Sequence, residues 1–205
     1  MTRRVWFTAD IHLAHPNVLH LSNRPFKNIE EMRRVILQNI NLRVKEEDVL
    51  YLLGDVSLGD KRSWVDFLEE LKCKNIILVK GNHDKYGTIP KDKVLAVIEQ
   101  CTIRLMGRTL LLCHHPYRIT VMRLLRSIRN IRSLRHLMSL FSKVRPVDRG
   151  LWLIHGHTHA TTKTVPYHNR MLNVGVDAHN FCPVSGDEII RLIQIQESCV
   201  REIKA

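Results

Sequence analysis

Apolar runs and amphipathic stretches alternate along the first half of this chain. Three short runs are largely apolar: residues 5–9, 49–53 and 76–79. Such runs are typical of strands buried in a parallel sheet. Between them, residues 28–44 and 60–71 carry patterns that predict helices. Asn28 precedes Glu31 by three residues, a capping-box pattern that indicates the start of the first helix.

The second half of the chain continues the alternation. Its pattern predicts a helix over 91–98, hairpin strands over 103–106 and 109–113, and strands over 151–154 and 171–176. Gly107-Arg108 supplies the turn of the hairpin. Residues 188–195 fit either a helix or a final strand. Alternating strands and helices predict an α/β fold with a largely parallel sheet. Because neither a linker nor a repeat interrupts the pattern, we expect a single domain over residues 1–205.

The composition is that of a globular protein. The chain has 205 residues, of which 44% are hydrophobic and 25% charged, and these values argue against general disorder, collagen and coiled coil. We find no apolar run of about 18 residues, so we expect no transmembrane segment. The amino terminus meets Asp10 before an apolar stretch forms, which argues against a secretion signal and favours the cytoplasm. The five cysteines form no C-x-x-C pair, which favours a reducing compartment.

Most of the positive charge lies in one segment. The formal net charge is +12, and residues 117–149 contain nine Arg or Lys against the single acidic Asp148. Arginines recur there at every third position between apolar residues, which predicts a basic helical cap or insertion. Three interpretations stay open: a solvated basic face, a cap that binds substrate phosphates or nucleic acid, and an interfacial helix on anionic lipid.

Polar side chains follow five of the predicted strands directly. They are Asp10, Asp55, Gly81-Asn82, His114 and the histidines of 155–159. In open α/β sheets the ligand site lies outside the carboxyl ends of the strands. Since most of these residues are common metal ligands, the sequence predicts a metal site at this end of the fold.

The motifs occur in a specific order. They are D-x-H at Asp10–His12, G-D at Gly54–Asp55, G-N-H-D at Gly81–Asp84, a histidine at His114, and G-H-T-H at Gly156–His159. This set resembles the calcineurin-like metallophosphoesterase superfamily, in particular its small bacterial and phage branch, which the stretch Asn173–Asp177 also resembles. The resemblance implies a four-layer α/β/β/α sandwich, from which the Arg-rich insertion is the main departure.

The resemblance also implies a site with two divalent metal ions bridged by Asp55. One ion would be bound by Asp10, His12, Asp55 and His159. The other would be bound by Asp55, Asn82, His114 and His157. His114 and His115 are neighbours in the run Cys-His-His-Pro at residues 113–116. His115 is therefore an alternative ligand to His114, although the family pattern favours His114. Such mixed ligands suit manganese, which we expect first, as well as iron, nickel or zinc.

The resemblance gives roles to His83 and Asp84, whereas the substrate-contact candidates come from their positions near the first motif and in the Arg-rich segment. His83 would stabilise or protonate the leaving-group oxygen, and Asp84 would orient the His83 ring. Candidates for contact with the substrate are His15, Arg118, Arg123 and Arg126. The implied activity is hydrolysis of a phosphodiester or phosphomonoester by attack of metal-bound hydroxide.

Three alternatives stay open. The first is a nuclease that grips nucleic acid with the Arg-rich segment. The second is a non-catalytic scaffold of the same fold. Such scaffolds usually lose metal ligands, whereas every motif position is occupied here, which argues against this alternative. The third resembles the superfamily's membrane-surface hydrolases of nucleotide-linked lipids, which typically carry arginine at the position of His83.

Overall fold

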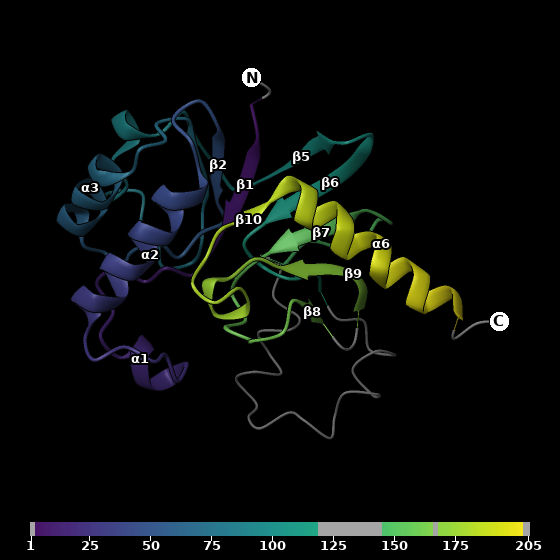
Figure 1. Ribbon diagram of the computed structural model, residues 1–205. Helices are drawn as coiled ribbons and strands as arrows, with labels where there is room; N and C mark the ends of the chain where they lie inside the picture. Colours follow the sequence, from purple (N-terminus) through teal and green to yellow (C-terminus); the bar gives the residue numbers. More distant parts are fainter. Residues whose placement is uncertain (1–2, 119–144, 166–167, 203–205) are drawn as a thin grey trace.

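Two five-stranded sheets form the framework of the protein (Figure 1). The computed structural model describes residues 3–118, 145–165 and 168–202. The first sheet has the strand order β10-β1-β2-β3-β4. Its strands are β1 (Val5–Thr8), β2 (Val49–Leu52), β3 (Ile76–Val79), β4 (Ala96–Ile98) and β10 (Val184–Ser185). β1 to β4 are parallel, and β10 pairs antiparallel with β1.

The second sheet has the strand order β5-β6-β7-β9-β8. Its strands are β5 (Gln100–Leu105), β6 (Arg108–Cys113), β7 (Trp152–His155), β8 (Thr164–Val165) and β9 (His168–Asn173). The predicted hairpin is confirmed as β5 and β6. Its turn lies at Met106-Gly107, where both residues have positive φ, and not at Gly107-Arg108 as predicted, because Arg108 already pairs with Leu105 as the first residue of β6. β6, β7 and β9 are parallel, so both sheets are rich in parallel strands, as the sequence predicts.

Helices flank the sheets. They are α1 (Val18–Leu21), α2 (Ile29–Arg43), α3 (Lys61–Glu70) and α6 (Gly186–Glu202), with 3₁₀ turns at η1 (Lys91–Lys93) and η3 (Val176–Ala178). Asn28 caps α2 by accepting a hydrogen bond from the Glu31 amide, which confirms the predicted helix start. Within the described residues, none of the helices is long and apolar enough to span a membrane.

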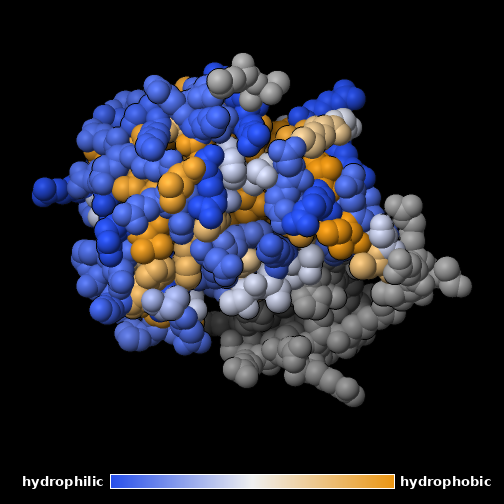
Figure 2. All heavy atoms as spheres, in the orientation of Figure 1, coloured by the Kyte–Doolittle hydropathy of each residue, from blue (hydrophilic) through white to orange (hydrophobic). Residues whose placement is uncertain are grey.

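Among the described residues, two large clusters of buried side chains hold the layers together, beside a smaller third cluster around Tyr117. One lies between the first sheet and the helices α2 and α3, and includes Leu50, Ile36 and Trp64. The other joins the two sheets and α6, and includes Phe7 and Ile154. In Figure 2 the surface over α2 and α3 is mostly hydrophilic with hydrophobic patches between, as expected for helices that bury their apolar faces. Two packed sheets rich in parallel strands, with few helices, agree with the metallophosphoesterase type of fold that the resemblance implies.

Some sequence-based expectations are wrong in detail. The predicted helix over 91–98 is instead the turn η1 followed by strand β4. The segment lies along the edge of β3, where Leu95 N donates to Ile76 O (2.7 Å) and Lys80 N donates to Ile98 O (2.8 Å). These non-local hydrogen bonds satisfy an exposed sheet edge and outweigh a short helical pattern.

The last predicted strand also differs from the structure, whereas the helix expected as one alternative near the end of the chain is confirmed. The predicted strand over 171–176 begins earlier, as β9, and ends at Asn173, after which Val176 enters the turn η3. Residues 188–195 lie in a helix, α6, because their apolar side chains join the core between the sheets. Most of the predicted helical insertion at 117–149 falls on residues 119–144, outside the described part of the chain.

Candidate metal centre

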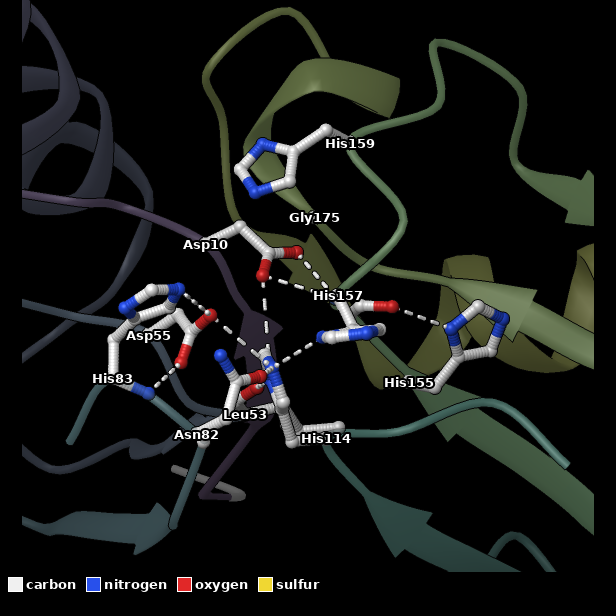
Figure 3. A network of polar contacts seen from close by, with 12 residues as sticks. Asp10, Leu53, Asp55, Asn82, His83, His114, His155, His157, His159 and Gly175 are labelled. Carbon is white, nitrogen blue, oxygen red and sulfur yellow. Dashed lines mark hydrogen bonds and ion pairs between the residues drawn. The ribbon is translucent and has the colours of Figure 1, made fainter. Parts of the chain in front are cut away.

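The loops after β1, β2, β3, β6 and β7 meet at one end of the two sheets (Figure 3). Backbone hydrogen bonds join these loops. Asp10 N donates to Gly54 O (3.0 Å), and Gly156 N donates to His114 O (3.1 Å). The structure therefore brings together, from five separate strand ends, the residues that the motifs select.

Many of these residues have an unusual backbone. Positive φ values occur at Asp10 (60°), His12 (59°), Asp55 (53°), His157 (72°) and His159 (48°). The left-handed region costs non-glycine residues about 1–3 kcal/mol each, and it is concentrated at functional sites. The surrounding fold evidently holds these side chains toward one another against that cost.

Asp55 lies between two groups of histidines. Its Oδ2 atom is 3.7 Å from His12 Nε2 and 3.3 Å from His114 Nε2. Its Oδ1 atom accepts a hydrogen bond from His83 N (2.9 Å). On the His12 side, His12 Nε2 lies 3.1 Å from His159 Nε2, and one ligand atom each of Asp10, His12 and His159 lies within 4.8 Å of the other two.

The second group is built around His114, which is fully buried. Its Nδ1 atom bonds the carbonyl of Leu53 (2.8 Å), so Nε2 faces the cluster. There Nε2 lies 3.2 Å from Asn82 Oδ1 and 3.2 Å from His157 Nδ1. Ligand atoms of Asp10, Asp55 and His114 all lie within 4.8 Å of one another.

Burial and charge set the protonation of the cluster. Burial lowers the pKa of His12 to about 3 and that of His157 well below its ordinary value. Burial also acts on His114, but the hydrogen bond with Asp55 and the Asp10 carboxylate outweigh it and raise the pKa of His114 to about 9. For Asp55, the His114 hydrogen bond outweighs burial and lowers the pKa. Neutral imidazoles and charged carboxylates are the forms that bind metal ions, so a metal ion bound by His114 would displace the proton that its raised pKa retains at neutral pH.

Two residues that the sequence analysis did not select support this cluster. Asp177 Oδ2 lies 3.1 Å from His159 Nδ1, which leaves His159 Nε2 directed at the site. Arg24 donates to both carboxylate oxygens of Asp177 (2.8 Å each). It also donates to the carbonyls of Asp10 (2.7 Å) and Ile11 (3.0 Å). Asp177 closes the noted 173–177 stretch, whereas Arg24 belongs to no motif and only the fold reveals it.

His83 and Asp84 occupy different positions. The His83 ring is partly exposed and its Nε2 atom lies 3.9 Å from Asp55 Oδ2. Both oxygens of the buried Asp84 carboxylate accept backbone hydrogen bonds, from Asp55 N (2.7 Å), Val56 N (3.0 Å) and Gly81 N (2.9 Å). Asp84 therefore bonds the two loops rather than the His83 ring, which differs from the role that the resemblance implied.

The remaining candidates lie around the cluster. His15 Nδ1 is 3.4 Å from His12 Nδ1, and the His15 ring lies 6.2 Å from the His83 ring. His115 packs its ring 4.5 Å from that of His157. His155 bonds the carbonyl of the neighbouring Gly156 with its Nδ1 atom, away from the cluster (Figure 3). Arg118 is described, whereas Arg123 and Arg126 lie outside the described residues.

Comparison with known proteins identifies the family whose motifs form this cluster of residues. The family model for the calcineurin-like phosphoesterases matches residues 3–177. The chain belongs to this family. The match includes every motif from Asp10 to His159, and the resemblance seen in the sequence is therefore confirmed. A calcineurin-like phosphoesterase uses divalent metal ions, which agrees with the clustered His and Asp side chains of this chain.

Relatives of this calcineurin-like phosphoesterase occur in archaea and phages. An uncharacterised protein of Methanocaldococcus jannaschii is 31% identical, over 94% of this chain and 92% of its own length. The gene 66 protein of Mycobacterium phage D29 is 28% identical, over 92% of this chain and 95% of its own. A crystal structure of a protein of unknown function from Aquifex aeolicus superposes with a TM-score of 0.68 at 26% identity, and covers 94% of this chain and 100% of that one.

Proposed function

We propose that this calcineurin-like phosphoesterase is an enzyme that hydrolyses a phosphodiester or phosphomonoester with the help of two divalent metal ions. The observation that carries the proposal is the position of Asp55 between two histidine groups, within 3.7 Å of His12 and 3.3 Å of His114. A carboxylate with an imidazole group on each side could share its oxygens between two ions, one held on each side.

The donor set fits two ions. Asp10, His12, Asp55 and His159 would hold one, and Asp55, Asn82, His114 and His157 the other. Carboxylate, imidazole and amide donors suit manganese, iron, nickel and zinc, and manganese is the ion to test first. When bound, the ions supply Lewis-acid charge to the phosphoryl group and activate a water at neutral pH.

The residues of the chain would divide the remaining work. The His83 ring is partly exposed at the edge of the cluster, where a substrate can reach it. Its imidazole would there donate a proton to the departing oxygen. Asp84 would act as a positioning residue, because its carboxylate holds the Asp55 and Gly81 amides in place. His15 lies beside His12 and would contact the substrate at the rim.

The metal requirement is tested with Asp55→Asn. We expect metal-stripped protein to take up two manganese ions and to hydrolyse bis(p-nitrophenyl) phosphate or p-nitrophenyl phosphate. Asp55→Asn should bind fewer ions and lose at least about a hundredfold of the turnover, since Lewis-acid stabilisation supplies several kcal/mol. Asp66→Asn, an exposed carboxylate on α3, is the matched control and should behave as the wild type. Folded protein that binds no divalent ion, or full turnover in Asp55→Asn, would contradict the proposal.

The role of His83 is tested separately by the choice of leaving group. We expect His83→Ala to slow a diester with an alkyl leaving group by about 10²–10⁴-fold, the usual contribution of a general acid. A p-nitrophenyl ester should be slowed far less, because p-nitrophenolate departs without a proton. Equal losses with both esters would instead assign His83 to substrate binding or to the structure.

The nuclease alternative remains a hypothesis. Its basis is the Arg-rich segment, most of which lies outside the described residues. Cleavage of single- or double-stranded nucleic acid, with a steep loss of binding as salt is raised, would favour it over a small-molecule substrate.

A further inference from the structure

A pocket of about 650 Å³ opens on the second sheet beside the candidate metal centre. This volume lies within the range of about 300–1,000 Å³ that is usual for small-molecule sites. Its floor is apolar and includes Leu111 and Cys113 of β6 together with Tyr117 and Leu151. Tyr117 donates its hydroxyl to the carbonyl of Leu151 (2.9 Å), so the aromatic ring is fixed in the floor.

Cations surround this apolar floor. The lining contains Lys80, Arg118, Arg145 and Arg149 against the single acid Glu99. Glu99 is the only acid among the described residues of the lining, and it already pairs with Lys80 (3.6 Å). The Nε atom of Arg118 is buried and has no hydrogen-bond partner in the described part of the protein. Such a lining suits an organic anion, because it combines an apolar surface with donors for phosphate.

The pocket shares a wall with the candidate metal centre. His115 lines the pocket, and its ring lies 4.5 Å from the ring of His157 and 4.9 Å from that of His114. Arg145, which is 5% exposed, lines the same pocket as His115. The pocket and the candidate metal centre therefore lie on opposite sides of one side chain, that of His115.

A backbone contact keeps the arginines together. Arg118 N donates to the carbonyl of Pro146 (2.9 Å), so the strand-end loop after β6 lies beside the segment 145–149. This contact places Arg118 next to Arg145 and Val147, the two residues that flank Pro146 in the chain. The basic side of the pocket is thus built by two segments that are hydrogen-bonded to each other, rather than by isolated surface side chains.

We propose that this pocket binds the second phosphate of the substrate, so that the enzyme selects organic phosphates that carry two phosphate groups, such as a nucleoside bisphosphate. The proposal rests on the proposed function, since the first phosphate is assigned to the metal centre. The apolar floor takes the organic part of the substrate, and Arg118 and Arg149 take the second phosphate. The specificity of this enzyme would accordingly be set in the pocket, and its chemistry at the metal centre.

The test compares two ligands that differ by one phosphate. Thymidine 3′,5′-bisphosphate and thymidine 5′-monophosphate are titrated into the manganese-loaded full chain by calorimetry. Chromatography after each titration checks that the ligand is intact. If a ligand is cleaved, the two ligands are compared by their KM values instead of their Kd values. We expect the bisphosphate to bind at least about tenfold more tightly, the effect of one or two charge-assisted hydrogen bonds. In Arg118→Gln and Arg149→Gln this preference should fall to about twofold or less.

The control is Arg62→Gln, an exposed arginine on α3 outside the pocket, which should keep the preference. Equal binding of the two ligands by the wild type would overturn the proposal, and so would a preference that survives in both pocket variants. Neither result affects the proposed function, which depends on metal uptake and turnover. Conversely, a preference for the bisphosphate without hydrolysis of any ester would sustain the pocket and refute the activity.

Discussion

The buried pair of Arg24 and Asp177 should govern both the stability of the protein and its metal affinity. The Arg24 side chain is 0% exposed and that of Asp177 3%. Arg24→Met removes a guanidinium that bonds both oxygens of Asp177 and two backbone carbonyls of the loop after β1. It leaves the Asp177 carboxylate buried without its main partner. Breaking a buried ion pair in this way costs about 3–5 kcal/mol of unfolding free energy.

The effects of Arg24→Met and Asp177→Asn on the free energy of unfolding should not be additive. In Arg24→Met/Asp177→Asn the uncompensated carboxylate is gone, so the double variant should be more stable than the sum of the single effects by about 1–3 kcal/mol. Urea unfolding of the metal-free protein measures each corner of this cycle. Arg33→Met is the matched control, because Arg33 pairs with Glu70 at the surface and should cost about 0–1 kcal/mol.

Loss of the Asp177 carboxylate should also weaken metal binding. Asp177 holds Nδ1 of His159, so Asp177→Asn should weaken manganese affinity by about 10–100-fold, the usual effect of losing such a support. Calorimetric titration with manganese measures it, and Arg33→Met should show no change. Additive effects on stability, within about 0.5 kcal/mol, together with unchanged manganese affinity in Asp177→Asn would refute the coupling.

Three further predictions concern other parts of the chain. Hydrogen bonds from three N–H groups outweigh burial and lower the pKa of Asp48, so its stabilisation is present above the unfolded-state pKa of about 3.9 and is lost as the pH falls through the lower folded-state value. Asp48→Asn should therefore flatten the acid side of the stability curve, measured by urea unfolding below about pH 4. An alanine Cβ at Gly81 would lie 2.2 Å from Asp55 Oδ1, so Gly81→Ala should cost about 1–3 kcal/mol and reduce metal uptake; wild-type uptake would contradict this. Finally, His114→Gln should bind one ion fewer than His115→Gln in a metal assay, whereas the reverse order would make His115 the ligand.

The sequence alone determined the elements with strong local signals. The capping box at Asn28 and the apolar runs that became β1, β2 and β3 are local patterns, and burial of continuous apolar runs in parallel strands follows directly from them. The ordered motifs resemble those of the calcineurin-like phosphoesterases, and the family match over residues 3–177 confirms that resemblance. Independently of the family, polar residues at the carboxyl ends of neighbouring parallel strands are expected to meet at one edge of the sheet. Which side chains gather at that end could therefore be predicted without coordinates.

Only the tertiary structure decided the features that depend on distant partners. Residues 96–98 became strand β4 because the free edge of β3 lay beside them, which no local pattern encodes. Arg24 is bonded to Asp177, 153 residues away in the chain. The pocket beside His115 likewise exists only because two segments are hydrogen-bonded through Arg118 and Pro146. Local periodicity reports which face of an element is buried, whereas long-range hydrogen bonds and ion pairs form between whichever groups the packing of the sheets brings together.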